Sequence, residues 1–370
     1  MVRVGLIGTG WGTRTQMPAF RLAGADVVAI CSGRRDRAEA AAKEWGVPVA
    51  TDDYRELVER DDVDVVSVCT PPAVHAEMSI AALNAGKHLI CEKPLAPTLA
   101  EASEIAEAGR VAAERRPGLV RVVHHEMRYI PIRRHLSDLV SQGFIGEPRA
   151  VVGSVLVPLG TDPTKEPYWY TWIADRAKGG GFMTGLMSHH LDLLRFTVGD
   201  LHDVTGHTSI LMNERPQLAW EYRDGDEIGP DSPTVGMREV DADDTAVATG
   251  RLDNRAPFVL SGTWSIHHGS GVRLELYGSE GSLVLDGPTL LGARAGDALA
   301  PQEPPACYGL PEGTGMVPLC AQMMQEVADV VDGRCEQSAT ILPTLDDGLA
   351  VQEIIENIGA APVRVSERTT

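Results

Sequence analysis

The sequence predicts an α/β fold in two domains: a parallel, doubly wound sheet in the first third, then an α+β domain with a large, open, mostly antiparallel sheet. Three observations support this prediction. The chain has 370 residues, more than a single hydrophobic core accommodates. Short apolar runs alternate with helical patterns up to about residue 125. Beyond that point longer strand patterns follow one another, several separated by tight glycine turns.

The first 125 residues read as successive βαβ units. The run VDVVSVCT (63–70) is almost continuously apolar, as expected of a strand buried on both faces. Gly24, Gly46 and Gly86 stand where helical patterns end, a position that favours glycine. We expect strands at 2–8, 26–31, 63–70, 87–91 and 119–124, and helices up to about residue 23 and at 36–45, 77–85 and 99–114.

The remaining residues, 126–370, are predicted to form the α+β domain, with the option that the C-terminal helix packs back on the first domain. Helices are expected at 132–142, 182–198, 319–331 and 345–358. Strands are expected at 149–157, 203–212, 245–252, 258–267, 272–277 and 282–285. Two segments rich in Gly, Pro and acidic residues, 221–233 and 301–315, read as loops.

Composition excludes several classes of function. The net charge is −19 without a local basic stripe, which argues against a nucleic-acid partner. No segment reaches the ~18–20 apolar residues of a membrane span, so no membrane role is expected. The six cysteines form no CxxC pair and no metal site is predicted; three lie in apolar runs. We expect a cytoplasmic protein with thiols in a reducing compartment.

A glycine-rich turn follows the first strand and opens a helix, which is the context of a dinucleotide-binding turn. The first glycine permits a tight turn, and the second lets the backbone approach a pyrophosphate at the helix N-terminus. The third glycine of the usual spacing is replaced by Thr13. The residues expected to bind the cofactor here are Gly8, Thr9, Gly10, Trp11, Gly12 and Thr13.

The second strand ends without the acidic residue that would accept hydrogen bonds from a ribose 2′-hydroxyl. It ends in Ser32 and Gly33, followed by Arg34 and Arg35. A hydroxyl and two guanidinium groups suit a 2′-phosphate, so NADP is the predicted cofactor, with NAD as the alternative. The structural alternative is that both arginines are solvated charges at a helix start.

Further polar residues follow the third and fourth strands, at the edge where ligands bind in open α/β sheets. They are Thr70, Pro71 and His75 after one strand, and Glu92-Lys93-Pro94 after the next. A semi-buried lysine has a depressed pKa and can exchange a proton with a substrate oxygen. Lys93 is therefore the candidate acid–base residue, whereas an isolated lysine is usually a solvated surface charge.

Two segments of the second domain carry further candidates. In GGGFMTGLMSHHLD (179–192), His189 and Asp192 share a helix face, which suits acid–base work by His189 and substrate binding by Asp192. His190 points about 100° away, so a metal cluster fails on geometry. In YWYTW (168–172), Trp169 and Trp172 offer aromatic faces for a sugar, or alternatively fill an interface.

Taken together, these motifs resemble the glucose–fructose oxidoreductase, inositol dehydrogenase and MocA family (Gfo/Idh/MocA). The resemblance extends through VGLIGTGWG, residues 66–96 with the EKP segment, and YGSEGSLVLD (277–286). It implies a Rossmann domain followed by a domain whose sheet forms homodimers or homotetramers. It also implies that Lys93 and His189 are catalytic, that His75 and Glu92 lie near the cofactor, and that Arg128 and Tyr129 contact substrate.

One position departs from the family pattern. The aspartate that precedes the family's histidine is Gly185 here. The leading hypothesis is an NADP-preferring oxidoreductase of a sugar, cyclitol or related ring substrate. An imine or keto reductase, a redox-neutral glycosidase or lyase with tightly bound cofactor, and a non-catalytic cofactor-sensing regulator remain alternatives.

Overall fold

The computed structural model describes residues 1–159, 171–218, 234–358 and 363–364, and it divides into two compact units. The first contains residues 1–129 and 310–352; the second contains 130–222, 228–309 and 353–370, apart from the positions outside the described ranges. The sequence-based division placed 126–370 in the second domain, with the option that the C-terminal helix packs back on the first. In the structure, residues 310–352 belong to the first unit.

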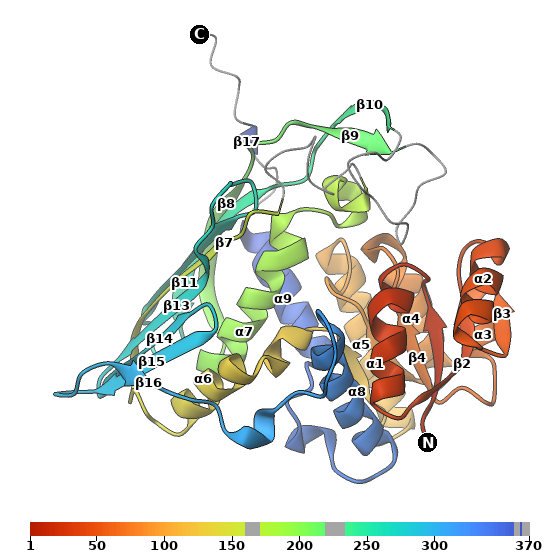
Figure 1. Ribbon diagram of the computed structural model, residues 1–370, viewed down its shortest axis with the longest axis horizontal. Coiled ribbons are helices and arrows are strands. Elements are labelled where there is room, and N and C mark those ends of the chain that lie inside the picture. The colour runs from red at the N-terminus through yellow and green to blue at the C-terminus, as the bar shows by residue number, and fades with distance from the viewer. Residues whose placement is uncertain (160–170, 219–233, 359–362, 365–370) are drawn as a thin grey trace. The chain divides into compact units, whose positions relative to one another are not determined.

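The first unit is built on a six-stranded parallel sheet of order β3-β2-β1-β4-β5-β6 (Figure 1). This is the strand order of a Rossmann fold, which confirms the predicted fold class. The strands are β1 (Arg3–Ile7), β2 (Asp26–Cys31), β3 (Val49–Thr51), β4 (Val65–Val68), β5 (His88–Cys91) and β6 (Arg121–Val123). The three-residue strand β3 was not predicted, because it is too short to show a periodic pattern.

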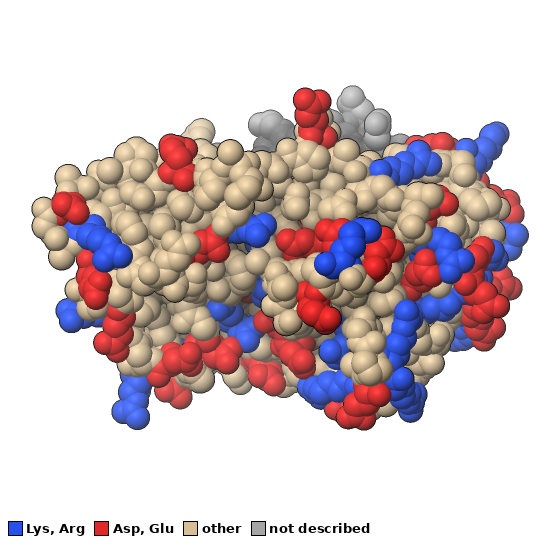
Figure 2. All heavy atoms as spheres, turned by 90° about the horizontal axis from the view of Figure 1, so that it is seen from below, with Lys and Arg blue, Asp and Glu red and all other residues tan. Residues whose placement is uncertain are grey.

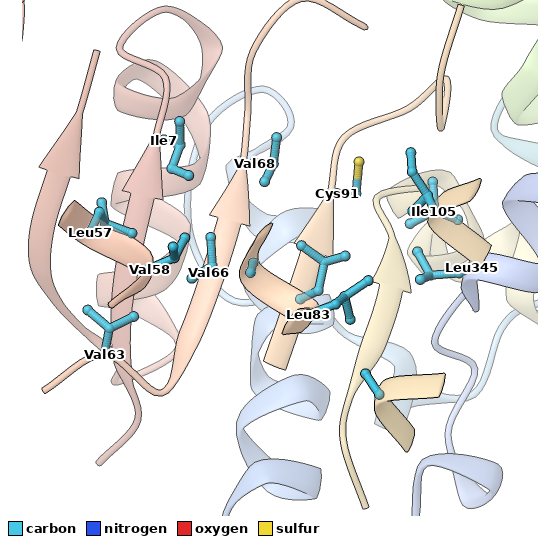
Figure 3. Close-up of a cluster of buried hydrophobic side chains, with 14 of the residues drawn as sticks. Ile7, Leu57, Val58, Val63, Val66, Val68, Leu83, Cys91, Ile105 and Leu345 are labelled. Atoms are coloured by element: carbon cyan, nitrogen blue, oxygen red, sulfur yellow. The ribbon is translucent and has the colours of Figure 1, made fainter. Parts of the chain in front are cut away.

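The helices of this unit connect successive strands and add a return from the C-terminal part. They are α1 (Met17–Leu22), α2 (Arg35–Trp45), α3 (Tyr54–Val58), α4 (His75–Asn84), α5 (Leu99–Arg115), α8 (Val317–Val331) and the first part of α9 (Leu345–Ile358). Small side chains let α8 pack on α1, where Ala19, Cys320 and Ala321 form one cluster. The main core lies between the sheet and its helices, and Leu345 of α9 belongs to it (Figure 3).

The second unit contains a sheet of order β16-β15-β14-β13-β7-β12-β11-β8-β17 among its described residues. Most neighbours are antiparallel, but β7–β12 and β8–β17 pair in parallel. The strands are β7 (Pro148–Leu156), β8 (Leu201–Ile210), β11 (Thr245–Leu252), β12 (Pro257–Thr263), β13 (Gly271–Gly278), β14 (Gly281–Asp286), β15 (Thr289–Arg294), β16 (Ala300–Pro301) and β17 (Val363–Arg364).

Helices α6 (Pro131–Ser141) and α7 (Ser188–Val198) lie on one face of this sheet (Figure 1). Close packing is possible because β12 has a glycine at the contact: a Cβ on Gly262 would lie 2.7 Å from the Phe182 ring, just before α7. A separate two-stranded ribbon, β9 (Glu214–Leu218) with β10 (Thr234–Glu239), was not predicted. The part of the chain that the structure describes contains no helix able to cross a membrane.

Candidate functional site

The carboxyl ends of the parallel strands bring the first-unit candidates to one edge of the sheet. Gly8 directly follows β1, Ser32 follows β2, Glu92 follows β5 and His124 follows β6. Because neighbouring strands pair in parallel, the residues that follow them lie at the same edge of the sheet. This edge is where an open α/β sheet binds its ligand.

The turn after β1 requires glycine at its first position. Gly8 has φ +117°, and a Cβ there would lie 1.9 Å from the Cys69 carbonyl oxygen. A Cβ at Gly12 would lie 3.3 Å from Leu6 and 3.5 Å from Cys69, so Gly12 provides the close packing of helix on strand. Thr13 instead closes the turn, since its hydroxyl donates to the Thr9 carbonyl at 2.7 Å.

The unusual spacing of these glycines, with Gly12 in place of a glycine at position 13, has a structural explanation. The chain enters the helix through a π-helical turn, residues Gly12–Gln16, before α1 begins. The glycine that packs against the strand is therefore Gly12, one residue earlier than the usual spacing, rather than Thr13. Trp11 lies on the outside of this turn and is 39% exposed.

The residues after β2 form an exposed, positively charged turn. The Thr9 hydroxyl donates to the Ser32 hydroxyl at 3.2 Å, and the space around Gly33 is open. Arg34 donates through Nε to Asp36 at 2.9 Å, which holds the pKa of that carboxyl below its usual value. Arg35 pairs with Glu39 at 2.8 Å. A phosphate at this turn would compete with carboxylates for both guanidinium groups.

His75 connects the end of β4 to the segment that carries Lys93. Its Nδ1 lies 3.0 Å from the Pro94 carbonyl oxygen, and its Nε2 lies 2.8 Å from the Thr70 carbonyl oxygen. A carbonyl oxygen only accepts, so both contacts are hydrogen bonds when the ring is protonated. Burial alone would lower the pKa of His75, but Cys91 and the Thr70 carbonyl outweigh it and raise the pKa to about 9.

Lys93 follows Glu92 at the end of β5, and the Lys93–Pro94 peptide is cis. Burial lowers the pKa of Lys93, while the carboxylates of Glu126 and Glu92 oppose the decrease. The Lys93 backbone N–H donates to Glu92 Oε2 at 3.2 Å. Lys93 is thus a partly exposed amine at the sheet edge, poised to exchange a proton at lower pH than a surface lysine.

A buried polar network surrounds Glu92. The Ser67 hydroxyl donates to Gln16 Oε1 at 2.6 Å, and Gln16 Nε2 donates to Glu92 Oε1 at 2.7 Å. His124 Nδ1 lies 3.0 Å from the same Glu92 oxygen and 3.5 Å from Glu126 Oε2. Sequence analysis missed this network. Its visible signal was His-His-Glu immediately after the last strand, at the edge where the other candidates gather.

Arg128 and Tyr129, expected to contact substrate, form contacts within the first unit. Arg128 Nη2 lies 3.4 Å from Asp347 Oδ2 of α9. The Tyr129 hydroxyl donates to Glu326 Oε2 of α8 at 2.8 Å, and its side chain is buried. These contacts attach the short helix at Glu126–Tyr129 to the returning segment.

The second-unit candidates lie on α7. His189 and Asp192 are both buried, at 3% and 1% exposure. Asp243 fixes the chain just before this helix: its carboxylate accepts from the Met183 N–H at 2.8 Å, and its backbone carbonyl accepts from Phe182 at 2.7 Å. Burial raises the pKa of Asp243 to about 7. Sequence analysis did not identify Asp243, which lies 60 residues beyond Met183 in the sequence.

The immediate surroundings of Gly185, one turn before His189, are apolar. A Cβ at Gly185 would lie 3.4 Å from the Trp264 ring and 3.5 Å from Ile173. Trp264 in turn packs edge-on against Phe182, with ring centroids 5.4 Å apart. His190 Nδ1 donates to the Leu186 carbonyl oxygen, 3.1 Å away, because a carbonyl oxygen only accepts. Burial lowers the pKa of His190 to about 3, so the ring is neutral at pH 7.

The structure thus brings the first-unit candidates to one sheet edge and places His189 and Asp192 on one helix of the second unit. Trp172 begins a short 3₁₀ turn, Trp172–Ala174, and is partly exposed. Trp169 lies outside the described residues. Among the described residues, no group of three or more His, Cys, Asp or Glu side chains could hold a metal ion.

Comparison with known proteins addresses the family. Residues 2–118 match the model "Oxidoreductase family, NAD-binding Rossmann fold", and residues 134–284 match "GFO/IDH/MocA C-terminal domain". An uncharacterized oxidoreductase of Synechocystis is 31% identical over 78% of this chain and 72% of its own. Levoglucosan dehydrogenase of Pseudarthrobacter phenanthrenivorans is 29% identical over 70% of this chain and 64% of its own.

Solved structures agree. A levoglucosan dehydrogenase in complex with NADH and L-sorbose has a TM-score of 0.81 and 26% identity, and the match covers 97% of this chain and 96% of that one. Together with the strand order and the glycine turn, these matches show that the chain belongs to the Gfo/Idh/MocA family of oxidoreductases.

Proposed function

We propose that this chain is an NADP-preferring dehydrogenase or reductase that transfers hydride between a nicotinamide and a sugar, cyclitol or related ring substrate. The observation that carries the proposal is Lys93: a lysine of lowered pKa, beside Glu92 and Glu126, at the ligand edge of a Rossmann sheet. Membership of an oxidoreductase family supports the same reaction class.

The glycine turn fits a dinucleotide. Gly8 leaves no room for a side chain against the Cys69 carbonyl, and Gly12 leaves little room against Leu6 of β1, so the backbone is compact where a pyrophosphate approaches. A protonated His75 places a positive charge beneath the same edge. When bound, the cofactor would donate or accept the hydride. The residues proposed to hold it are Gly8 to Thr13, Ser32 to Arg35, Thr70, Pro71, His75, Glu92 and Lys93.

The preference for NADP rests on the turn after β2. Ser32 stands where an acidic residue would select NAD, Gly33 leaves open space, and two guanidinium groups follow. Arginine binds phosphate with paired, charge-assisted hydrogen bonds. The solved levoglucosan dehydrogenase complex contains NADH, so the preference proposed here would distinguish this chain from that relative.

The proton chemistry is assigned to this chain's own side chains. Lys93 would bind the substrate oxygen and exchange its proton, because burial lowers the pKa of its ammonium group. His189 is proposed as the second proton-handling group, and Asp192, Arg128, Tyr129, Trp169 and Trp172 as substrate-binding residues. Levoglucosan dehydrogenase is named for a sugar-derived substrate, which supports the same substrate class here.

A second candidate is reduction of a ring ketone or an imine. Gly185 stands where the family pattern has an aspartate, so this position supplies no carboxylate. The atoms nearest to a Cβ there would belong to Trp264 and Ile173. A substrate with fewer hydroxyl groups than a free sugar would suit such apolar surroundings, because it needs fewer hydrogen-bond partners.

We also propose a homo-oligomer that uses the open sheet of the second unit. Val152 of β7 and Val259 of β12 are paired neighbours on adjacent strands, and they are 48% and 40% exposed. Adjacent exposed valines on a sheet favour burial against another surface. The described part of the chain has its cysteines as free thiols, consistent with the proposed cytoplasmic location.

The experiment is a spectrophotometric screen of sugars, cyclitols, ring ketones and cyclic imines with NADP(H) and NAD(H), repeated with Lys93→Ala. We expect turnover with at least one substrate and a loss of at least ~100-fold in the variant, the scale of acid–base catalysis. Near-normal turnover of a folded Lys93→Ala protein would remove the central assignment. Cofactor retained through purification, with turnover but no net change in absorbance, would indicate a redox-neutral reaction instead.

A further inference from the structure

Two carboxylates converge on a single buried histidine next to Lys93. His124 is fully buried, and its Nδ1 lies 3.0 Å from Glu92 Oε1 and 3.5 Å from Glu126 Oε2. Glu92 and Glu126 are themselves buried, at 8% and 4% exposure. Burial raises the pKa of Glu126, and repulsion from Glu92 adds to this increase, whereas His124 opposes it. Both carboxyls therefore stay ionised only with a cation beside them. An imidazolium at His124 meets that requirement.

The network fixes the orientation of Glu92. One oxygen accepts from Gln16 Nε2 at 2.7 Å and faces His124, and the other accepts from the Lys93 backbone N–H at 3.2 Å. Ser67 holds Gln16 in turn through a 2.6 Å hydrogen bond. The carboxylate that contacts His124 is therefore also attached to the residue proposed to handle the substrate proton.

The same two carboxylates act on the Lys93 ammonium group. Burial has the largest effect on the pKa of Lys93 and lowers it. Glu126 and then Glu92 have the next largest effects, and both raise this pKa by favouring the protonated amine. Alone, two buried carboxylates would hold the Lys93 proton tightly. A protonated His124 neutralises part of the negative charge of the two carboxylates and so weakens their hold on the Lys93 proton.

We propose that His124 is a positioning residue that balances the charge of Glu92 and Glu126 and thereby sets how readily Lys93 gives up its proton. The proposal rests on the proposed catalytic role of Lys93. It adds a function for His124 and Glu126, two residues that follow β6.

A further titratable group that acts on His124 is the Cys320 thiol of α8. Burial raises the pKa of Cys320, so it remains a neutral thiol near pH 7. Burial opposes protonation of His124, but the Glu92 carboxylate outweighs burial and raises the pKa of His124. Burial also opposes ionisation of Glu92, but His124 outweighs burial there and lowers the pKa of Glu92 to about 2.

This charge balance predicts opposite effects for two neutral substitutions. His124→Gln removes the compensating cation, so the carboxylates act on Lys93 with full strength and its pKa rises. Glu126→Gln removes one carboxylate, so the pKa of Lys93 falls. We expect at least about one pH unit in each direction, the low end of what a neighbouring charge produces. A purely structural role would not give shifts of opposite sign.

The measurement is an NMR pH titration of the ¹³Cε signals of labelled lysine in the cofactor-free protein. The sequence contains five lysines (Lys43, Lys87, Lys93, Lys165 and Lys178), so the Lys93 signal can be assigned by its loss in Lys93→Arg. His125→Gln is the matched control for the loss of a buried imidazole, since His125 is adjacent to His124 in sequence and is also buried, at 1% exposure. Thermal unfolding of each variant verifies that it is folded.

Opposite shifts in the two variants, with less than about 0.3 unit in His125→Gln, support the proposal. Shifts of the same sign, or no shift in a folded variant, overturn the proposal. If His124→Gln does not fold, the Glu126→Gln variant alone decides: an unchanged or raised Lys93 pKa in that variant overturns the proposal. The kinetic pH profile then tests the proposed function separately. If the NMR shifts appear but the profile does not follow them, the network stands and the catalytic role of Lys93 fails.

Discussion

The sheet edge of the first unit and the immediate surroundings of Gly185 in the second unit differ in charge. The first concentrates buried ionic groups around Lys93: Glu92, Glu126, His124 and His75. The second surrounds Gly185 with Trp264, Ile173 and Phe182, and its His190 has a pKa of about 3. On the surface, by contrast, acidic and basic residues are interspersed, without an extended basic area on the face in Figure 2.

This difference suggests a division of roles. Charged cofactor groups and a mobile proton need compensating charges, which the first unit provides. A ring substrate gains more from apolar faces and a few hydrogen bonds, which the second unit provides. This division of roles would be wrong if function in the second unit also required buried charged residues around Gly185. It would also be wrong if the first unit tolerated the loss of its buried charged residues.

The largest expected effect is at His189. We expect His189→Gln to lower turnover by about 100-fold, the scale of a lost acid–base group. Cofactor affinity, measured by fluorescence titration, should change less than twofold, because His189 belongs to the second unit. His190→Gln is the control, with turnover expected within about threefold of the parent. Equal losses in both variants, together with lowered melting temperatures, would make His189 a structural residue.

The next effect tests the apolar surroundings of α7. Gly185→Asp would place a carboxylate against Trp264 and Ile173, and we expect the free energy of unfolding to fall by about 2 kcal/mol. Gly185→Ala is the matched control: its Cβ would meet Trp264 at 3.4 Å, an ordinary contact, so stability should stay equal or rise by about 0.5 kcal/mol. Urea unfolding measures both. Similar stability of the two variants would refute an apolar site.

The third effect concerns His75 and the pH dependence of stability. Its folded pKa of about 9 exceeds the unfolded value near 6.5, so its stabilising contribution is complete below pH 6.5 and is lost as pH rises through 9. The stability difference between the parent and His75→Gln should therefore shrink between pH 6.5 and 9.5 in parallel urea titrations. A difference independent of pH would mean that His75 is neutral in the folded protein.

The smallest effect expected is at Arg34. The Arg34 guanidinium group already pairs with Asp36. Binding a 2′-phosphate would replace that ion pair, so the net gain is smaller than that of a new charge-assisted hydrogen bond. We expect Arg34→Ala to weaken NADPH binding about fivefold and to leave NADH binding nearly unchanged, as measured by calorimetry. If both cofactors lose affinity equally, the preference for NADP is wrong.

The sequence was most informative where local pattern determines structure. The parallel strands of the first unit were predictable because a strand buried on both faces is apolar throughout, as in Val65–Val68. The edge on which Gly8, Ser32 and Glu92 gather followed from the direction of parallel strands. Two-residue and three-residue strands such as β16 and β3 were missed, because they are too short for periodicity.

Contacts between distant segments were not predictable. His124 and Gln16 lie 108 positions apart in numbering yet both approach one oxygen of Glu92. Asp243 fixes the start of a helix that begins at Ser188. An isolated aspartate or histidine carries no sign of its partner, so such residues emerge only when the fold brings their backbones together.

The returning segment has a practical consequence for dissecting this protein. Leu345 of α9 packs in the core with Ile105, and a Cβ at Gly348 would lie 3.2 Å from Val123 (Figure 3). The Val123 amide also donates to the Pro343 carbonyl at 3.0 Å. A cofactor-binding fragment cut after Tyr129 would lack these partners, leaving apolar surface and a strand edge uncovered. Only a fragment that fuses 310–352 to that end would retain the unit's own interior.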